Sequence, residues 1–136
     1  MEGKGRVLID TCIWVSFFNR PQSRERRAVD LLLDDDRVAL VGPILAEILI
    51  GFRRDEQADW VASILRGVHF LEVTWNQWRA AAKLGRQLMA KGAALPMSDL
   101  VVGAVALERG MAVFTTDPHF DQIPNLKRFE YKQEAG

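Results

Sequence analysis

The sequence predicts an α/β fold with three layers, in which helices cover both faces of a largely parallel sheet of four or five strands. Two observations carry this prediction. Short apolar runs suited to buried strands alternate along the chain with longer segments of helical periodicity, and turn residues separate the two kinds of segment. The 136 residues contain no repeat, linker or low-complexity stretch. We therefore expect one domain spanning residues 1–136.

The first half of the chain predicts two strands and four helices. The strands are the apolar runs at 6–10 and 38–42. Ser23 is suited to cap a helix that runs to about residue 34, and Pro43 is suited to the first turn of another. The remaining two helices are expected at 11–18, before the break at 19–21, and in an amphipathic segment that ends near residue 67.

The second half predicts two further strands, a possible fifth, and a pair of helices. Residues 69–73 and 111–115 read as strands, and 126–131 as the fifth. Thr74 and Gln77 fit a capping box that opens a long helix ending at Gly92. Ser98 is expected to cap a helix at 99–109, which Gly110 closes.

The aromatic content suggests where the core lies. The four tryptophans are expected to pack mainly in the interior, with Trp14 the best of them for a partner or substrate surface. The others are Trp60, Trp75 and Trp78.

Composition narrows the classes of function. Hydrophobic residues make up 49% of the chain and charged residues 26%, a balance typical of a soluble globular protein. No apolar stretch approaches the roughly 20 residues of a membrane-spanning helix. The net charge of +0 argues against indiscriminate nucleic-acid binding. The one cysteine, Cys12, excludes an internal disulfide and fits a reducing cytosol, so we expect a cytoplasmic protein.

Four acidic residues follow or interrupt apolar runs: Asp10, Glu47, Asp99 and Asp117. A carboxylate is rarely placed at the mouth of a buried element unless it is paired, hydrogen-bonded or bound to a metal. In a parallel sheet the ends of the strands and the starts of the following helices share one edge, which brings Asp10, Glu47 and Asp117 together. Asp99 joins them if the helices at 75–91 and 98–109 form a hairpin.

Such an acidic cluster suits a divalent cation. Mg²⁺ and Mn²⁺ prefer oxygen ligands, and with a phosphate substrate they activate a bound water and stabilise charge on the leaving oxygen. Thr11 and Thr115 flank two of the acids and could orient a carboxylate or contact a phosphate. Structural explanations remain open for Asp99, as a helix-terminal acid, and for Asp117, as a turn residue before proline. We interpret His119 as a loop residue that supports the fold or contacts solvent.

The motifs VLIDTCIW, LAEILIG, SDLVVGAVALERG and VFTTDPHF, in this order and spacing, resemble those of PIN-domain proteins of the VapC toxin type. The likeness runs from residue 6 to about 131. It implies a PIN-like fold and an endoribonuclease that depends on Mg²⁺ or Mn²⁺ and cleaves RNA. It also implies inhibition by a VapB-like antitoxin and frequent homodimer formation.

The resemblance assigns roles to particular residues. Antitoxin contacts are implied for three aromatic residues of the first helix, Trp14, Phe17 and Phe18. Thr115 matches the threonine two positions before the last acid, and Thr11 follows the first acid as expected. Thr116 stands where relatives often have arginine, which weakens the expectation of a phosphate contact there. The family's catalytic and metal-binding acids match Asp10, Glu47, Asp99 and Asp117.

Two other hypotheses compete with this one. A phosphatase of the haloacid-dehalogenase type or a receiver domain also has an aspartate closing its first strand. The phosphatase pattern requires a second aspartate where this chain has Cys12, and a receiver requires a pair of acids earlier in the chain. The last hypothesis is a catalytically silent binding module with a PIN-like fold, which gives no reason to keep four mutually repelling carboxylates.

Overall fold

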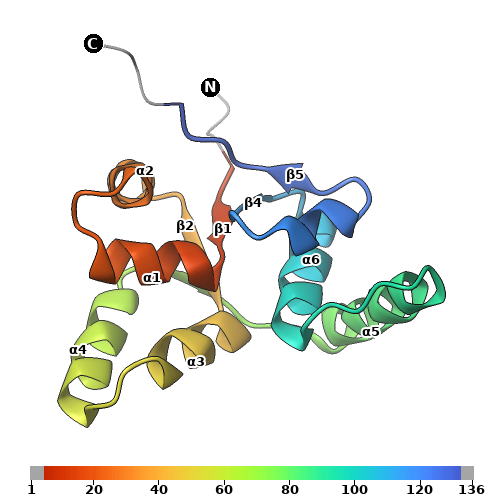
Figure 1. Ribbon diagram of the computed structural model, residues 1–136, viewed down its shortest axis with the longest axis horizontal. Helices are drawn as coiled ribbons and strands as arrows, with labels where there is room; N and C mark the ends of the chain where they lie inside the picture. The colour runs from red at the N-terminus through yellow and green to blue at the C-terminus, as the bar shows by residue number, and fades with distance from the viewer. Residues whose placement is uncertain (1–4, 133–136) are drawn as a thin grey trace.

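The computed structural model describes residues 5–132, which form a five-stranded sheet in the order β3-β2-β1-β4-β5 (Figure 1). Every neighbouring pair of strands is parallel. The strands are β1 (Val7–Ile9), β2 (Val38–Val41), β3 (His69–Leu71), β4 (Ala112–Phe114) and β5 (Lys127–Arg128). The predicted α/β fold is confirmed, and its sheet is entirely parallel across the described residues.

Helices connect the strands and cover both sides of the sheet. Figure 1 shows α1, α2 and α4 on one side of β1, with α5 and α6 on the other. The helices are α1 (Thr11–Asn19), α2 (Arg24–Asp34), α3 (Gly42–Ile50), α4 (Asp55–Leu65), α5 (Trp75–Ala90), α6 (Met97–Arg109) and the short 3₁₀ helix η1 (Pro118–Gln122). No helix in residues 5–132 has the length and apolar character needed to cross a membrane.

The central strands are buried because helices lie on both of their faces. Every residue of β1 and β2 is buried, which explains why these runs are apolar throughout and do not alternate. Each large aliphatic side chain buried here contributes about 1.5–3 kcal/mol to stability. The core therefore fixes the positions at which the strands end, and these ends carry the site described below.

Several helix boundaries follow from the predicted local chemistry. The Ser23 hydroxyl accepts a hydrogen bond from the Arg26 amide at 3.1 Å, as expected of an N-cap. The Thr74 hydroxyl accepts from the Gln77 amide at 3.1 Å, and the Gln77 side chain accepts from the Thr74 amide at 2.9 Å, which confirms the capping box. Gly110 closes α6 in the left-handed conformation with φ of 65°.

Two predictions about local structure are wrong. Helix α6 begins at Met97, and Pro96 precedes it without a side-chain cap. Ser98 is not the cap, because its hydroxyl is directed across the fold to Glu47. Of the tryptophans only Trp14 is buried, while the side chains of the other three are exposed because they lie on the outer faces of α4 and α5: Trp60, Trp75 and Trp78.

The helix pair α5 and α6 determines how the second half of the chain returns to the sheet. Helix α6 packs against β4, and α5 packs mainly against α6. Two glycines permit close packing here. A Cβ atom on Gly85 would lie 3.0 Å from Leu100 Cδ1, and one on Gly103 would lie 2.8 Å from Ile123 Cδ1. The predicted hairpin is present, and it brings the first turn of α6 to the edge at which β1, β2 and β4 end.

Candidate metal centre

Asp99 is a buried carboxyl group in the first turn of α6. Its Oδ2 atom is buried and has no hydrogen-bond partner within residues 5–132. Burial raises the pKa of Asp99 to about 6, and the negative charges of Asp10, Asp117 and Glu47 add to the shift. A buried carboxylate oxygen without a partner is costly, so this atom is well placed for a cation.

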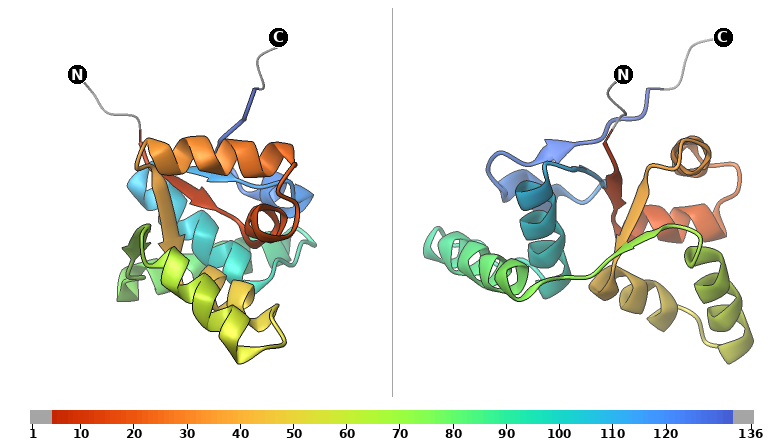
Figure 2. Two further views of the ribbon diagram at one scale, coloured as in Figure 1. Left: turned by 90° about the vertical axis from the view of Figure 1, so that its left-hand side faces the viewer. Right: turned by 180° about the vertical axis from the view of Figure 1, so that it is seen from behind.

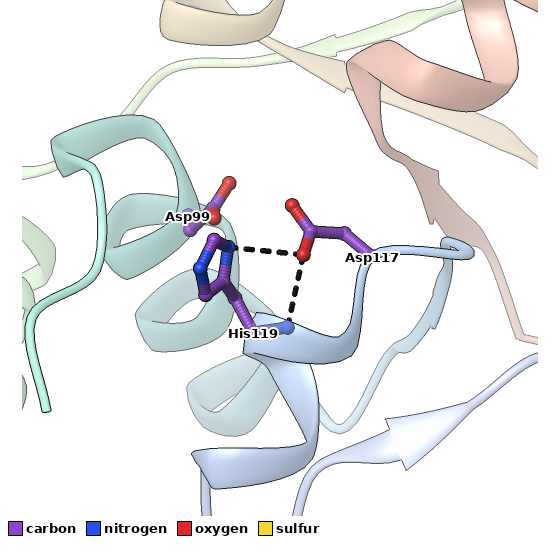
Figure 3. A group of neighbouring side chains, drawn as sticks. All are labelled: Asp99, Asp117 and His119. Atoms are coloured by element: carbon purple, nitrogen blue, oxygen red, sulfur yellow. Dashed lines mark hydrogen bonds and ion pairs between the residues drawn. The ribbon is translucent and has the colours of Figure 1, made fainter.

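Asp117 and His119 complete a compact group with Asp99 (Figure 3). One potential ligand atom from each of the three residues lies within 4.8 Å of the other two. Asp117 caps η1, and its Oδ1 accepts a hydrogen bond from the His119 amide at 2.9 Å. The His119 Nδ1 lies 3.0 Å from the same oxygen. The tight turn at Pro118 therefore brings the imidazole beside two carboxylates.

Asp10 joins the end of β1 to the start of α1. Its Oδ1 accepts from the Thr11 amide at 2.8 Å, and its Oδ2 accepts from the Thr115 hydroxyl at 2.8 Å. The Cys12 thiol donates more weakly to the same Oδ2 at 3.4 Å. Burial raises the pKa of Asp10, and the charge of Asp117 adds to this effect, although the hydrogen bonds act in the opposite direction.

Thr115 connects two of the acids directly. Its hydroxyl donates to Asp10 and accepts a hydrogen bond from the Asp117 amide at 2.9 Å. The residue is buried at the end of β4. Two roles were expected for Thr115, to orient a carboxylate or to contact a phosphate, and these hydrogen bonds match the first.

Glu47 lies on α3 and is held by two hydroxyl groups. The Thr11 hydroxyl donates to Oε1 at 2.6 Å, and the Ser98 hydroxyl donates to Oε2 at 2.8 Å. Each donor is the chain neighbour of another acid, Asp10 or Asp99. Glu47 is exposed at the surface of the site, so both hydrogen bonds fix a side chain that would otherwise move freely.

The four predicted acids thus meet at one edge of the sheet. The compact group contains Asp99 and Asp117 together with His119, which we had interpreted as a fold-supporting or solvent-exposed loop residue. Asp10 and Glu47 connect to that group through hydroxyl groups of neighbouring residues. Two carboxylates, one of which has an unpartnered buried oxygen, and an imidazole fit a divalent metal ion, because carboxylates suit Mg²⁺ and Mn²⁺ and transition metals also accept imidazole.

Sequence reasoning missed the role of Ser98 and undervalued His119. Ser98 had a local explanation as a helix cap, and its actual partner lies 51 residues earlier in the chain. The signal that could have identified His119 is its position directly after Pro118 and two residues after Asp117. This spacing places the imidazole on the same turn as the Asp117 carboxylate.

The aromatic residues of α1 lie away from the metal centre. Trp14 and Phe17 are buried, exposed to only 1% and 7%, so their side chains are not presented to a partner as we had expected. They pack against each other at 5.5 Å between ring centroids and belong to the core. Phe18 is half-buried and lines a groove with Phe52. Of the three expected antitoxin contacts, only Phe18 keeps an accessible position.

A known protein family matches most of the chain. The model of the PIN domain family matches residues 7–126. The chain belongs to the PIN domain family. This family is typically made up of metal-dependent nucleases. The chain is therefore neither a phosphatase of the haloacid-dehalogenase type nor a receiver domain, the two alternative α/β families considered from the sequence. No curated protein matched the sequence of the chain.

Solved structures with the same fold include VapC toxins of VapBC toxin–antitoxin systems. VapBC2 from Rickettsia felis, bound to a DNA fragment from its promoter, has a TM-score of 0.79 at 21% identity, covering 93% of this chain and 98% of that one. DNA-bound VapBC from Salmonella typhimurium has a TM-score of 0.76 at 20% identity, with coverage of 93% and 98%. VapC20 of Mycobacterium tuberculosis, a sarcin-ricin loop cleaving toxin, has a TM-score of 0.63 at 16% identity, with coverage of 85% and 92%.

Proposed function

We propose that this protein is a metal-dependent endoribonuclease toxin that a cognate antitoxin inhibits. The observation that carries the proposal is the unpartnered, buried Oδ2 of Asp99 at the centre of an acidic cluster. A buried acid with a purely structural role would be expected to have a hydrogen-bond or ion-pair partner for each oxygen. The family assignment and the fold shared with VapC toxins support the same activity.

The residues of the site would have two kinds of role, holding the metal ion and orienting the carboxylates. Asp99 and Asp117 would hold Mg²⁺ or Mn²⁺ together with His119, and Asp10 and Glu47 complete the anionic cluster. When bound, the ion would supply an activated water and stabilise charge on the phosphate. Thr115 orients Asp10. Thr11 and Ser98 orient the carboxylate that lies on α3.

The antitoxin would bind away from the metal centre, in a groove between α1, α3 and the start of α4. The groove has a volume of about 730 Å³ and apolar walls that include Val15, Phe18 and Phe52. Arg53 and Arg54 line it as well. An antitoxin helix with one apolar face and acidic flanks fits this surface.

We also propose that the protein forms a homodimer and acts in the cytoplasm, as the resemblance to VapC toxins and the single cysteine led us to expect.

Cleavage of RNA by the purified protein tests the proposed activity. We expect cleavage with Mg²⁺ or Mn²⁺, none with EDTA, and loss of cleavage by at least about 100-fold in Asp10→Asn and Asp99→Asn. Asp59→Asn is the matched control, because it removes an exposed carboxylate on α4. Equal cleavage by all of these proteins would indicate a contaminating nuclease and overturn the proposal.

The toxin role requires a separate measurement. Expression of the wild-type chain should arrest growth, and Asp99→Asn should relieve the arrest at equal protein level. Arrest by both proteins would mean that toxicity does not depend on the metal centre. Metal-dependent cleavage without arrest would leave a nuclease that is not a toxin.

A further inference from the structure

Helix α5 presents one strongly basic face to solvent. Its 16 residues contain no aspartate or glutamate. The opposite side packs toward α6 through four buried residues: Gln77, Ala81, Leu84 and Leu88. Figures 1 and 2 show α5 at the periphery of the molecule, outside α6. We use the name α5 basic face for the surface formed by Arg79, Lys83 and Arg86.

The three charges lie close together and are not neutralised. Their spacing of four and three residues aligns them along one side of the helix. All three residues are exposed, and none has a hydrogen-bond or ion-pair partner in the described chain. Like charges at this spacing destabilise a helix by a few tenths of a kcal/mol per pair. The fold itself therefore gives no reason for the arrangement, and a ligand with negative charges does.

The shape and the neighbouring side chains also suit a ligand. The basic side chains line a shallow hollow of about 520 Å³ together with Ala80 and Ala82. Trp75 and Trp78 begin the same helix, and their side chains are exposed to 79% and 43%. Exposed tryptophans beside a row of arginine and lysine are typical of surfaces that bind single-stranded nucleic acid, where phosphates pair with the cations and bases stack on the rings.

The position of the face relates it to the metal centre. Gly85 packs directly against Leu100, the residue after Asp99, so Arg86 lies at about the level of the site on the outer helix of the pair. The basic face is turned away from α6, so RNA bound there would extend beyond the metal centre and across α5.

We propose that the α5 basic face binds the phosphate backbone of the RNA substrate outside the metal centre. The proposal rests on the proposed ribonuclease function and adds a surface that selects longer single-stranded substrates. A second copy of the chain fits less well, because a two-fold contact through this face would place like charges opposite each other.

Binding measurements at several salt concentrations test this surface without cleavage. All proteins carry Asp99→Asn, and fluorescence anisotropy follows a labelled single-stranded RNA of about 20 nucleotides, longer than the roughly 4–16 nucleotides that one OB-fold module covers. The test variant combines Arg79→Gln, Lys83→Gln and Arg86→Gln. The control variant removes three exposed charges elsewhere through Arg66→Gln, Arg109→Gln and Lys127→Gln.

We expect the slope of log K against log salt to fall by about 2 in the test variant, since each phosphate contact to a single strand contributes about 0.7. The control should keep the slope of the parent. Trp75→Ala should weaken binding by at least about five-fold, the effect of losing one stacked base.

Equal slopes in the test and control variants would overturn the proposal. So would a change from dimer to monomer in the test variant with no change in slope, because the face would then be a contact between copies. These outcomes differ from a failure of the proposed function. In that case the wild-type protein cleaves no RNA, whereas the anisotropy still reports whether the face binds it.

Discussion

At the scale of single residues, the fold keeps a costly arrangement at Asp99. Its carboxyl group is buried, one oxygen lacks a partner in residues 5–132, and three other acids surround it. Without a cation, an ionised Asp99 destabilises the folded state, which is why its pKa is raised. The cation-free fold is therefore less stable than it would be with a neutral side chain at this position, and the carboxylate is available to bind a positive charge.

This cost predicts that Asp99→Asn stabilises the metal-free protein. The pKa of Asp99 is about 6 in the fold against 3.8 in the unfolded reference, so the folded state holds the proton more tightly. The free energy of unfolding should therefore fall as pH rises from about 4 to 6, and stay lower above that range. Removing the charge should restore roughly 1–3 kcal/mol at pH 7.5, because one pKa unit corresponds to about 1.4 kcal/mol.

Urea denaturation in EDTA at pH 4.5 and 7.5 measures this effect. The gain from Asp99→Asn should be larger at pH 7.5 than at pH 4.5. A variant less stable than the wild type at pH 7.5 would show that the carboxylate has a structural partner after all. Asp59→Asn again serves as the exposed control.

The residue scale also shows what the sequence can and cannot predict. Asp10 and Asp117 were expected at a common edge because each follows a predicted strand, and parallel topology brings the ends of such strands together. The contacts of Ser98 depend on the distance between α3 and α6, which no local pattern encodes. A side chain that fits a local role, such as a cap, hides its long-range partner from any argument based on neighbours.

At the scale of elements, the packing of α6 determines where Asp99 lies. Gly103 sits in the buried middle of α6, and a Cβ atom there would approach Ile123 Cδ1 to 2.8 Å and Leu84 Cδ2 to 3.4 Å. The glycine thus allows α6 to lie against both α5 and the segment after η1. The same helix carries Asp99 one turn earlier.

Replacement of this glycine should shift or destabilise α6. Gly103→Val is expected to lower the free energy of unfolding by about 1–3 kcal/mol through overpacking, despite the better helix propensity of valine. Chemical denaturation measures the change. Gly92→Ala is not a suitable comparison because its φ is 83°, so Gly67→Ala, with its nearest neighbour at 3.5 Å, is the control. Unchanged stability in Gly103→Val would mean that α6 has room to move.

The order of elements was predictable, and their exposed faces were not. Apolar periodicity and helix-end signals located all six α-helices of the described chain, because each helix buries one side on a neighbour. The prediction that Trp60, Trp75 and Trp78 pack in the core was wrong. A large aromatic side chain on an outer helix face is exposed unless another element covers it, and the sequence does not state which elements cover α4 and α5.

At the scale of the whole molecule, the candidate metal centre joins parts of the chain that are distant in sequence. Contacts at the site link β1 with α1, then α3, the start of α6, and the segment from β4 to η1. An ion bound by Asp99, Asp117 and His119 would bind the folded state and not the unfolded chain. It should therefore stabilise the entire fold by mass action.

Thermal unfolding with and without Mn²⁺ tests this linkage. Mn²⁺ at 100 times its dissociation constant should add about 2.7 kcal/mol and raise Tm by several degrees at pH 7.5. At pH 5 the rise should be much smaller, because Asp99 with a pKa of about 6 is then mostly protonated and protons compete with the metal. Asp99→Asn should show little rise at either pH. An equal rise in wild type and variant would place the ion elsewhere on the protein.

The span of chain that builds the centre also has a consequence for synthesis. Its side chains run from Asp10 near the start to His119, and Asp10 is held by Thr115, a residue 105 positions further on. Domains made on the ribosome acquire their contacts only as residues emerge. A nascent chain therefore has no assembled centre until η1 has left the exit tunnel. The nuclease activity proposed above would therefore require synthesis of the chain through η1, because Asp117 and His119 lie at that short helix.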